Sequence, residues 1–524
     1  MPVAIGIDLG TSNTCAAVVR AGGVAVIPDE QGRRVLPSFL TLDEQDRVLV
    51  GYPARAQAIA NPYETIYAVK RLMGQRYGSL EVQTARRYLT YPVVEGGTDE
   101  VRVQVKDRAL SPEEVSAEIL KSVRAQAERY LGEPVTHAVI TVPAHFNDSQ
   151  RKATKRAGEM AGLDVLRLIN EPTAAALAYG FGRNITQRVA VFDFGGGTFD
   201  ITILSIGDQV YEVLSTNGDS YLGGEDFSNR LTDHLCEDFR RLTGIDLRPD
   251  RVSLQRVKDA AEWAKITLST EMQTRVHVPK VVPWHDPRLN LDVLVDRATL
   301  EGMVVDLVQR SLEICQVALD LSRLSVDDVD EIIMVGGQTR MPLIQQRVET
   351  FFRKRPNLSV NPDEVVAVGA AIQADALLAS DSDMLLLDVT PLTLGIASFG
   401  DMFTVLIEKN SKVPRKVSRT FTTNSDFQER VKIQVCQGES KRASENVFLG
   451  EFNLDGIRKA RRMEPRIEVT FKLDANGILN VNGRDLDTGQ EQNITIRDYA
   501  KRAAEYAHPG LPSGHNADDP DLPR

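Results

Sequence analysis

Cysteine is scarce in this chain, and histidines in metal-binding patterns are missing. The 524 residues include four cysteines, Cys15, Cys236, Cys315 and Cys436, with no C-x-x-C pair, and the seven histidines lack metal-ligand spacing. These absences argue against a disulfide framework and a zinc site, and they predict reduced thiols in a reducing compartment. We expect Cys15, which follows a glycine-containing turn, to be a small buried core residue.

Long apolar runs and an excess of basic residues are also missing. No segment approaches the ~20 apolar residues of a membrane-spanning helix, and no basic stretch followed by an apolar one marks a signal peptide. The net charge is −11 and the isoelectric point about 5.4, which argues against bulk nucleic-acid binding. The expectation is a cytoplasmic protein that binds neither membranes nor nucleic acid.

The composition that is present is ordinary for a globular protein. Hydrophobic residues make up 42% of the chain and charged residues 26%, as in typical folded domains. At roughly 150 residues per domain, the length predicts about three domains.

Two short stretches share one pattern. Residues 193–200 read Asp-Phe-Gly-Gly-Gly-Thr-Phe-Asp, and residues 8–14 read Asp-Leu-Gly-Thr-Ser-Asn-Thr. Each stands between apolar or alternating β-branched runs, which predicts a strand, a tight turn and a second strand. The three glycines would allow positive φ angles and a close approach by a ligand.

Such turns can bind an anion through successive N–H groups. A carboxylate at Asp8 or Asp193 would repel that anion unless a cation lay between them, and Mg²⁺ is the natural candidate. The two hairpins together predict two lobes of related fold that face one nucleotide.

Helical periodicity and capping residues mark several segments between and after the hairpins. They predict helices over residues 112–131 (with a capping box formed by Ser111 and Glu114), 148–161, 171–180, 222–243 and 254–270. On the last of these, Glu262, Lys265 and Ser269 share one face. From the pattern alone, a solvated charged face is the better interpretation of this trio.

A third strand, residues 330–335, runs into Gly336 and Gly337 and then a helix to about residue 352, an arrangement suited to a nucleotide. A further helix over 365–378 carries Gly369, Ala370 and Ala371, which permit close packing. Short alternating segments follow from 391 to 496, including a hairpin at Asn476-Gly477, and they predict an all-β sandwich. The residues from about 509 are expected to be disordered.

These motifs together resemble the heat-shock protein 70 chaperones of the bacterial DnaK type. The resemblance covers about residues 3–498 and includes Gly6-Ile-Asp-Leu-Gly-Thr11, Ile169-Asn-Glu-Pro-Thr-Ala-Ala-Ala176, the 193–200 stretch, Val335-Gly-Gly-Gln-Thr-Arg-Met-Pro342 and the Leu385-Leu-Leu-Asp388 linker. It implies an α/β fold, with an actin-like two-lobed ATPase domain over residues 1–379, a linker over 380–388 and an all-β sandwich peptide-binding domain over 389–497. Residues 498–524 would be a vestigial lid helix and a disordered tail.

The resemblance also implies the site residues. Lys70, Glu171, Asp193, Thr198 and Asp8 would be catalytic, and Asp8 and Asp193 would hold Mg²⁺ largely through water. ATP or ADP would contact Gly10, Thr11, Ser12, Asn13, Gly195, Gly196, Gly197, Thr198, Glu262, Lys265, Ser269, Gly336, Gly337, Arg340 and Asp363. The family also binds K⁺ near the phosphates. The resemblance thus reverses the interpretation of the Glu262 trio.

Coupling and partner contacts are implied in the same way. Pro143 and Arg151 would relay the nucleotide state from the ATPase domain to the linker. The apolar run Leu385, Leu386 and Leu387 would dock on the ATPase domain in one nucleotide state and be released in the other. Arg167, Asn170 and Asp388 would engage a J-domain co-chaperone. A nucleotide exchange factor is a further implied partner. An unfolded or extended hydrophobic peptide would contact Ile396, Phe399, Met402, Phe421, Asn424, Val431 and Ile433, which on pattern alone are ordinary sandwich core.

The chain departs from the family pattern in four places. The sequence does not continue into the family's long helical lid, so either the protein naturally lacks a lid or this chain is shortened. Without a lid we expect weak binding and fast exchange of peptide. Phe399 and Asn424 replace the usual Met and Ala that arch over the peptide. His145 replaces the usual Tyr, and a neutral packed ring is the favoured interpretation over a pH-sensitive one. Ser12 replaces a Thr and keeps its hydroxyl.

The leading hypothesis is therefore an ATPase that works as a chaperone, cycling its affinity for unfolded peptides. One alternative is a small-molecule kinase of the same actin-like superfamily, which leaves residues 389–497 unexplained. The other is a regulated scaffold whose β-domain binds one dedicated protein.

Overall fold

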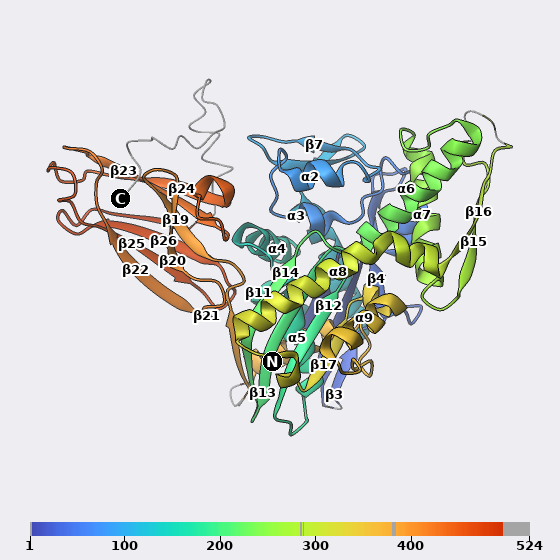
Figure 1. Cartoon of the computed structure of the whole chain (residues 1–524), viewed down its shortest axis with the longest axis horizontal. Coiled ribbons are helices and arrows are strands. Elements are labelled where there is room, and N and C mark those ends of the chain that lie inside the picture. The colour runs from blue at the N-terminus through green and yellow to red at the C-terminus, as the bar shows by residue number, and fades with distance from the viewer. Residues whose placement is uncertain (1–2, 22, 283–285, 287, 380–383, 496–524) are drawn as a thin grey trace. The chain divides into compact units, whose positions relative to one another are not determined.

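The computed structural model describes residues 3–21, 23–282, 286, 288–379 and 384–495 (Figure 1). Its contacts divide the chain into two compact units. The N-terminal unit comprises residues 1–144 and 153–386, and the C-terminal unit comprises 145–152 and 387–524. The predicted linker residues 380–383 and the predicted lid helix and tail, 498–524, lie outside the described residues.

Two sheets of related topology form the centre of the N-terminal unit (Figure 1). The first has the order β11–β10–β1–β2–β3, with β4 beside β2, and the second begins β17–β12–β13–β14. In each, an antiparallel meander is extended by a parallel strand from later in the chain, β10 beside β1 and β17 beside β12. The strands are β1 Val3–Leu9, β2 Asn13–Arg20, β3 Gly23–Val26, β4 Val35–Pro37, β10 Val135–Val142, β11 Asp164–Asn170, β12 Gln187–Phe194, β13 Phe199–Gly207, β14 Val210–Asp219 and β17 Glu331–Val335. The two lobes predicted from the repeated hairpin are therefore present.

Strand β12 shows why these strands read as continuous apolar runs. Its residues from Val189 to Phe194 are all buried, because both faces of the sheet are covered. Alternate side chains enter two different cores, with Ala190, Phe192 and Phe194 in one and Val189 and Val191 in the other. This strand therefore carries Asp193 at its end on a rigid support.

Helices and short hairpins complete the N-terminal unit. The helices are α1 Tyr52–Gln57, α2 Leu80–Ala85, α3 Pro112–Leu131, α5 Glu171–Gly180, α6 Gly224–Thr243, α7 Arg251–Thr267, α8 Arg297–Ser322, α9 Pro342–Phe352 and α10 Val365–Leu378, with α4 Asp148–Met160 divided between the units and 3₁₀ turns η1 Val69–Leu72, η2 Val326–Asp328 and η3 Gly337–Arg340. The remaining strands are β5 Leu40–Leu42, β6 Val48–Val50, β7 Val93–Glu95, β8 Val101–Val105, β9 Arg108–Leu110, β15 Gln273–Val278 and β16 Leu291–Asp296. The predicted capping box of α3 is confirmed, since Ser111 and Glu114 exchange both hydrogen bonds.

Helix α10 packs against its neighbours at backbone contact, as its small residues predicted. A Cβ atom added to Gly369 would lie 1.7 Å from the carbonyl oxygen of Ala174 in α5. A Cβ atom added to Gly6 in β1 would lie 2.0 Å from the backbone nitrogen of Ala371. The helix is therefore held directly against both α5 and the first sheet.

The C-terminal unit contains two four-stranded antiparallel sheets, in agreement with the predicted all-β sandwich. Their orders are β20–β19–β23–β24 and β22–β25–β26–β27, and side chains from both, such as Ile433 and Phe471, form one core. The strands are β18 Leu385–Val389 (shared with the N-terminal unit), β19 Leu394–Ser398, β20 Met402–Ile407, β21 Lys412–Val413, β22 Arg415–Phe421, β23 Arg430–Gln437, β24 Val447–Asp455, β25 Ile467–Leu473, β26 Leu479–Asp485 and β27 Glu491–Thr495, with a 3₁₀ turn η4 Ala443–Glu445. The predicted hairpin at Asn476-Gly477 joins β25 to β26, and Gly477 has a φ of +72°.

One local prediction was wrong, and one of the two roles considered for the glycine-rich turn is not used. Helix α7 ends at Thr267, so Ser269 lies in the turn after the helix and not on its face, although its Oγ still donates to the Lys265 carbonyl oxygen at 3.4 Å. The three glycines of residues 195–197 do not have positive φ angles. The absence of a side chain at Gly196 and Gly197 therefore allows another part of the chain to come close to this turn, and it does not serve a left-handed backbone conformation.

Candidate functional site

The two hairpin turns of the N-terminal unit face one another. A Cβ atom on Gly196 would lie 2.3 Å from Ser12 Oγ, and one on Gly197 would lie 2.4 Å from Thr11 Oγ1. A Cβ atom on Gly195 would meet nothing closer than the Thr198 carbonyl oxygen, at 3.7 Å. A side chain at Gly196 or Gly197 would therefore displace Ser12 or Thr11 of the first turn.

This contact predicts different outcomes for two neighbouring substitutions. Gly197→Ala is expected to lower the free energy of unfolding of the N-terminal unit by about 1–3 kcal/mol, because the added methyl group overpacks against Thr11. Gly195→Ala, the matched control, is expected to change it by less than about 1 kcal/mol. Urea unfolding of the two variants measures both effects, and equal destabilisation would contradict the apposition of the turns.

A buried charged cluster lies beside the turns. Lys70, on η1, is 5% exposed, and its Nζ lies 2.6 Å from Oε1 of Glu171, the first residue of α5. Asp8 and Asp193 stand at corresponding positions near the ends of β1 and β12. Burial, reinforced by the Glu171 carboxylate, raises the pKa of Asp8 to about 7 and that of Asp193 well above its usual range. Lys70, to which the resemblance assigns a catalytic role, is therefore buried within this cluster and does not lie at the surface.

The donor set of this cluster fits a hard cation. Asp193 Oδ2 is buried with no hydrogen-bond partner among the described residues, and Asp8 Oδ1 accepts from Thr141 Oγ1 at 3.2 Å. No three acidic, histidine or cysteine side chains in the described ranges group closely enough to enclose a metal ion. An ion here would be Mg²⁺ that keeps most of its waters, since oxygen ligands and retained water suit this ion.

Sequence reasoning missed the ion pair between Arg71 and Asp226. The Arg71 guanidinium contacts both carboxylate oxygens of Asp226, and its Nη2 also donates to the Gly197 carbonyl oxygen at 3.1 Å. Asp226 Oδ2 in turn accepts from the Gly223 backbone N–H at 2.8 Å, at the start of α6. The pair ties the second turn to η1 and α6. The only signal in the sequence was the position of Arg71 directly after Lys70.

Helix α7 and the Gly336 turn carry further predicted nucleotide residues. Lys265 Nζ lies 2.8 Å from Glu262 Oε2 and donates to the Gly224 carbonyl oxygen at 3.0 Å. Gly336 has a φ of +81°, and a Cβ atom on it would lie 2.4 Å from the Phe194 carbonyl oxygen. Gly336 therefore lies directly against the strand that leads into the second turn. Lys265 is linked to that turn through the start of α6.

Arg340 and Asp363, two further predicted nucleotide residues, form an ion pair with atoms 2.5 Å apart. Gly337 belongs with them, because a Cβ atom on it would lie 3.5 Å from Asp363 Oδ1. Both charged side chains remain partly exposed, Arg340 the more so.

Most of the predicted coupling residues of the N-terminal unit are buried or half-buried. Asn170 is 4% exposed and precedes α5 as its N-cap residue, and Arg167 is half-buried. Pro143 is buried. The Leu385 N–H donates to the Gln209 carbonyl oxygen at 3.1 Å, and Leu386 is buried in the same core as Val189.

In the C-terminal unit the predicted peptide residues fall into two groups. Phe399 and Met402 are exposed, whereas the other five are buried: Ile396, Phe421, Asn424, Val431 and Ile433. Four of these, all but Asn424, belong to the sandwich core. Leu387 is half-buried and Asp388 is 7% exposed.

His145 and Arg151 belong to the segment 145–152 of the C-terminal unit. Burial, with the nearby charges of Lys409 and Arg151, lowers the pKa of His145 to about 4. The ring is therefore neutral near pH 7, in agreement with the favoured interpretation. Arg151 is buried, and its Nε donates to the Phe146 carbonyl oxygen at 3.1 Å.

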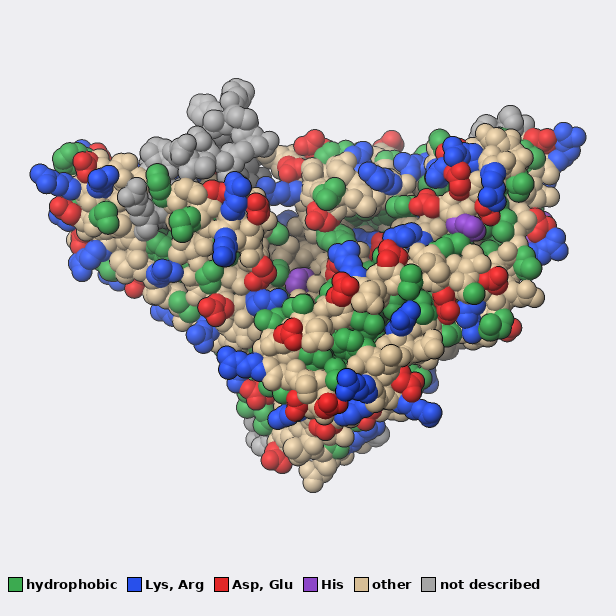
Figure 2. Space-filling model, viewed as in Figure 1, with side chains coloured by type: hydrophobic (Ala, Val, Ile, Leu, Met, Phe, Trp, Pro, Cys, Tyr) green, Lys and Arg blue, Asp and Glu red, His purple; other side chains and the backbone are tan. Residues whose placement is uncertain are grey.

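Surface properties agree with the composition. Acidic and basic side chains alternate over the face drawn in Figure 2, without a large basic patch. Among the described helices, none combines the length and the apolar character needed to cross a bilayer.

One comparison with known proteins bears on this site. A family model described as Hsp70 protein matches residues 4–508 of the chain. The match spans both units and nearly the whole sequence.

Proposed function

The chain belongs to the Hsp70 family, and we propose that it is an ATP-hydrolysing chaperone that couples its nucleotide state to the binding and release of unfolded peptides. A chaperone function with nucleotide binding, normally with Mg²⁺, follows from the family. The observation that carries the finer proposal is the buried Lys70–Glu171 pair, whose charges act on Asp8 and Asp193 of the two hairpins.

Within the proposed site, the residues divide the work of phosphoryl transfer to water. Lys70 places a compact positive charge where negative charge develops on the transferring phosphate. Glu171, held at the start of α5, orients the attacking water, and Thr198 contacts that water or the terminal phosphate. When bound, Mg²⁺ supplies charge neutralisation and Asp8 and Asp193 hold it through water. K⁺ is a further proposed ion near the phosphates.

The nucleotide itself is proposed to bridge the two turns and α7. Backbone N–H groups of residues 10–13 and 195–198 take the phosphates, and Glu262, Lys265 and Ser269 take the adenosine. Gly336, Gly337, Arg340 and Asp363 complete the pocket in the proposal. The apposition of the turns supports this arrangement, since a Cβ atom on Gly196 or Gly197 would meet Ser12 or Thr11 of the opposite turn.

Communication with the peptide domain is proposed to run through the Leu385–Asp388 strand. Leu386 is buried in the N-terminal core here, and its release would expose apolar surface, which gives a difference in free energy between two states. Pro143 and Arg151 act as relay residues in the proposal. A J-domain co-chaperone at Arg167, Asn170 and Asp388, and a nucleotide exchange factor, are the proposed regulators.

The proposed peptide site lies on the β-sandwich, where an extended chain adds main-chain hydrogen bonds to apolar contacts. Phe399 and Met402 are its exposed apolar members. We propose that Phe399 and Asn424 form the arch over the peptide. The ring of Phe399 and the amide of Asn424 then decide which peptide sequences the domain prefers.

A turnover assay tests the proposed function. We expect slow ATP hydrolysis that a J-domain and an unfolded polypeptide each accelerate, and that both accelerate most together. Phosphate release is measured with the full chain, with native folded protein in place of the unfolded one as the control. ATP turnover that requires a phosphate-accepting metabolite would favour a small-molecule kinase, and no turnover under any condition would favour a scaffold.

A further inference from the structure

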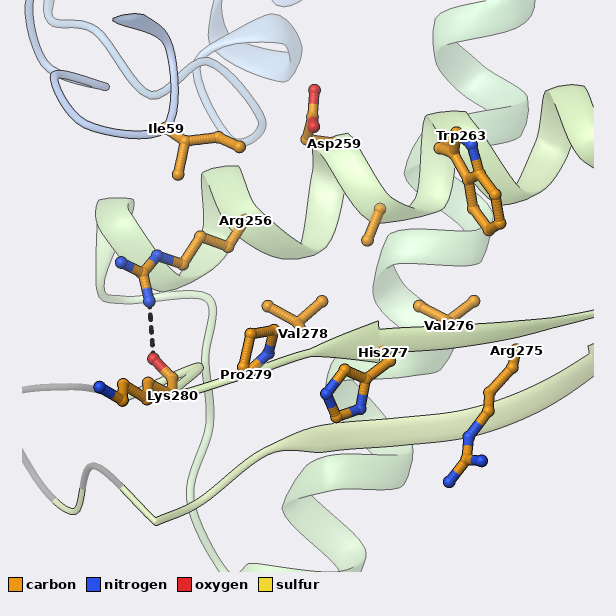
Figure 3. A pocket seen from close by; sticks show the side chains of 11 residues that line it. Ile59, Arg256, Asp259, Trp263, Arg275, Val276, His277, Val278, Pro279 and Lys280 are labelled. Atoms are coloured by element: carbon orange, nitrogen blue, oxygen red, sulfur yellow. Dashed lines mark hydrogen bonds between the residues drawn. The ribbon is translucent and has the colours of Figure 1, made fainter. Parts of the chain in front are cut away.

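A cavity of about 650 Å³ lies in the N-terminal unit between helix α7 and strand β15 (Figure 3). Arg256, Ala260 and Trp263 line it from the helix, and Val276, Val278 and Lys280 line it from the strand and the residues after it. The volume lies within the roughly 300–1,000 Å³ of small-molecule sites. The cavity is large enough for a ligand of one or two rings.

The floor of the cavity is apolar and one wall is aromatic. Val276 and Val278 are 1% and 7% exposed, which makes them a firm floor. Trp263 is 55% exposed, and Figure 3 shows its indole extending from α7 toward β15. A flat apolar group between the indole and the valines would remove exposed aromatic surface from water.

One end of the cavity carries an incompletely satisfied cation. Arg256 Nη1 donates to the Lys280 carbonyl oxygen at 2.7 Å, and Figure 3 shows this contact. Arg256 Nε is buried and has no hydrogen-bond partner among the described residues. A buried donor of this kind without a partner costs about 1–3 kcal/mol, which an acceptor on a ligand would recover.

The charges around the cavity favour an anion. Arg275 and His277 both face Asp292, at 2.6 Å and 3.5 Å. Within the described ranges, Arg256 and Lys280 form no ion pair, and Asp259 is the one acidic side chain among the lining residues. The lining therefore carries two cations, Arg256 and Lys280, that form no ion pair with a described residue, and one carboxylate. A planar guanidinium with an unpartnered N–H group matches a carboxylate in shape and charge.

We propose that this cavity binds a small aromatic carboxylate, whose carboxylate group accepts from Arg256 and whose ring packs between Trp263 and the valine floor. The site is distinct from the proposed nucleotide site. Arg256, Ala260 and Trp263 follow one stripe of α7, at spacings of four and three, whereas Glu262 and Lys265 follow another. The proposal does not depend on ATP hydrolysis.

Calorimetric titration of the full chain with 2-naphthoate tests the proposal, with 2-naphthamide as the neutral probe of the same shape. We expect one saturable site for 2-naphthoate and binding of 2-naphthamide weaker by at least about tenfold. Arg256→Gln is expected to weaken 2-naphthoate by a similar factor. Trp263→Ala is expected to weaken both probes, because it removes the aromatic wall that they share.

The matched control is Arg241→Gln, which removes an exposed guanidinium from the same lobe, at the end of α6, and should leave both affinities unchanged. The thermal midpoint of each variant shows whether it is folded. The proposal is overturned by equal affinity for the two probes, by no saturable binding of 2-naphthoate, or by loss of binding in Lys265→Ala with full binding in Arg256→Gln. The last result would assign the probe to the nucleotide site.

Discussion

Lys70→Ala is expected to lower the rate of ATP turnover by about 100-fold or more. Lys70 forms an ion pair with Glu171 in the buried carboxylate cluster, and a positively charged donor positioned at developing charge contributes about that factor. Its ammonium lies 2.6 Å from Glu171, so its loss also removes the partner that holds that carboxylate. Single-turnover phosphate release measures the chemical step directly.

Nucleotide affinity separates the catalytic role of Lys70 from a structural one. The turns and α7 remain in the variant, so we expect the dissociation constant for ADP to change by no more than a few fold. Lys121→Ala, which removes an exposed lysine on α3, is the control and should keep full turnover. Unchanged turnover in Lys70→Ala, with intact nucleotide binding, would contradict the proposed role of this residue.

Gly369→Ala is expected to lower the free energy of unfolding of the N-terminal unit by about 3 kcal/mol or more. The new methyl group would lie 1.7 Å from the carbonyl oxygen of Ala174, and that oxygen belongs to the backbone of α5. Helix α10 can accept the group only by moving away from α5 and β1 together, which loses contacts over its whole buried length. Urea unfolding followed by circular dichroism measures the loss.

The same substitution in another helix provides the control. Gly302 lies within α8, and a Cβ atom on it would meet nothing within 4 Å. Gly302→Ala is therefore expected to stabilise the unit by about 0.5–1 kcal/mol, because alanine is the better helix former. If the two variants had similar stabilities, helix propensity and not packing would decide the effect at Gly369.

Local patterns in the sequence determined most of the secondary structure near the site. The hairpins at Asp8 and Asp193, the capping box of α3 and the bounds of α5 and α10 follow from periodicity and capping residues, which act between neighbours in the chain. The predicted sandwich follows for the same reason. The long helix α8 and the β15–β16 hairpin were not recognised, and the cavity beside α7 depends on that hairpin.

Tertiary structure decided the chemistry of individual side chains. Burial of Lys70 against Glu171, the pair of Arg71 with Asp226 and the raised pKa of Asp8 each join residues far apart in the sequence, so no local pattern contains them.

The glycines of the second turn make the same point. The sequence allowed two roles for Gly195, Gly196 and Gly197, positive φ angles and close approach by a ligand. In the structure none of the three has a positive φ, and a Cβ atom on Gly196 or Gly197 would meet Ser12 or Thr11 of the first turn. The sequence by itself thus determined that two hairpins with similar glycine-containing turns exist. Only the tertiary structure decided that the first turn lies where a side chain at Gly196 or Gly197 would stand. Steric contact and burial depend on the distance in space and not on the distance along the chain.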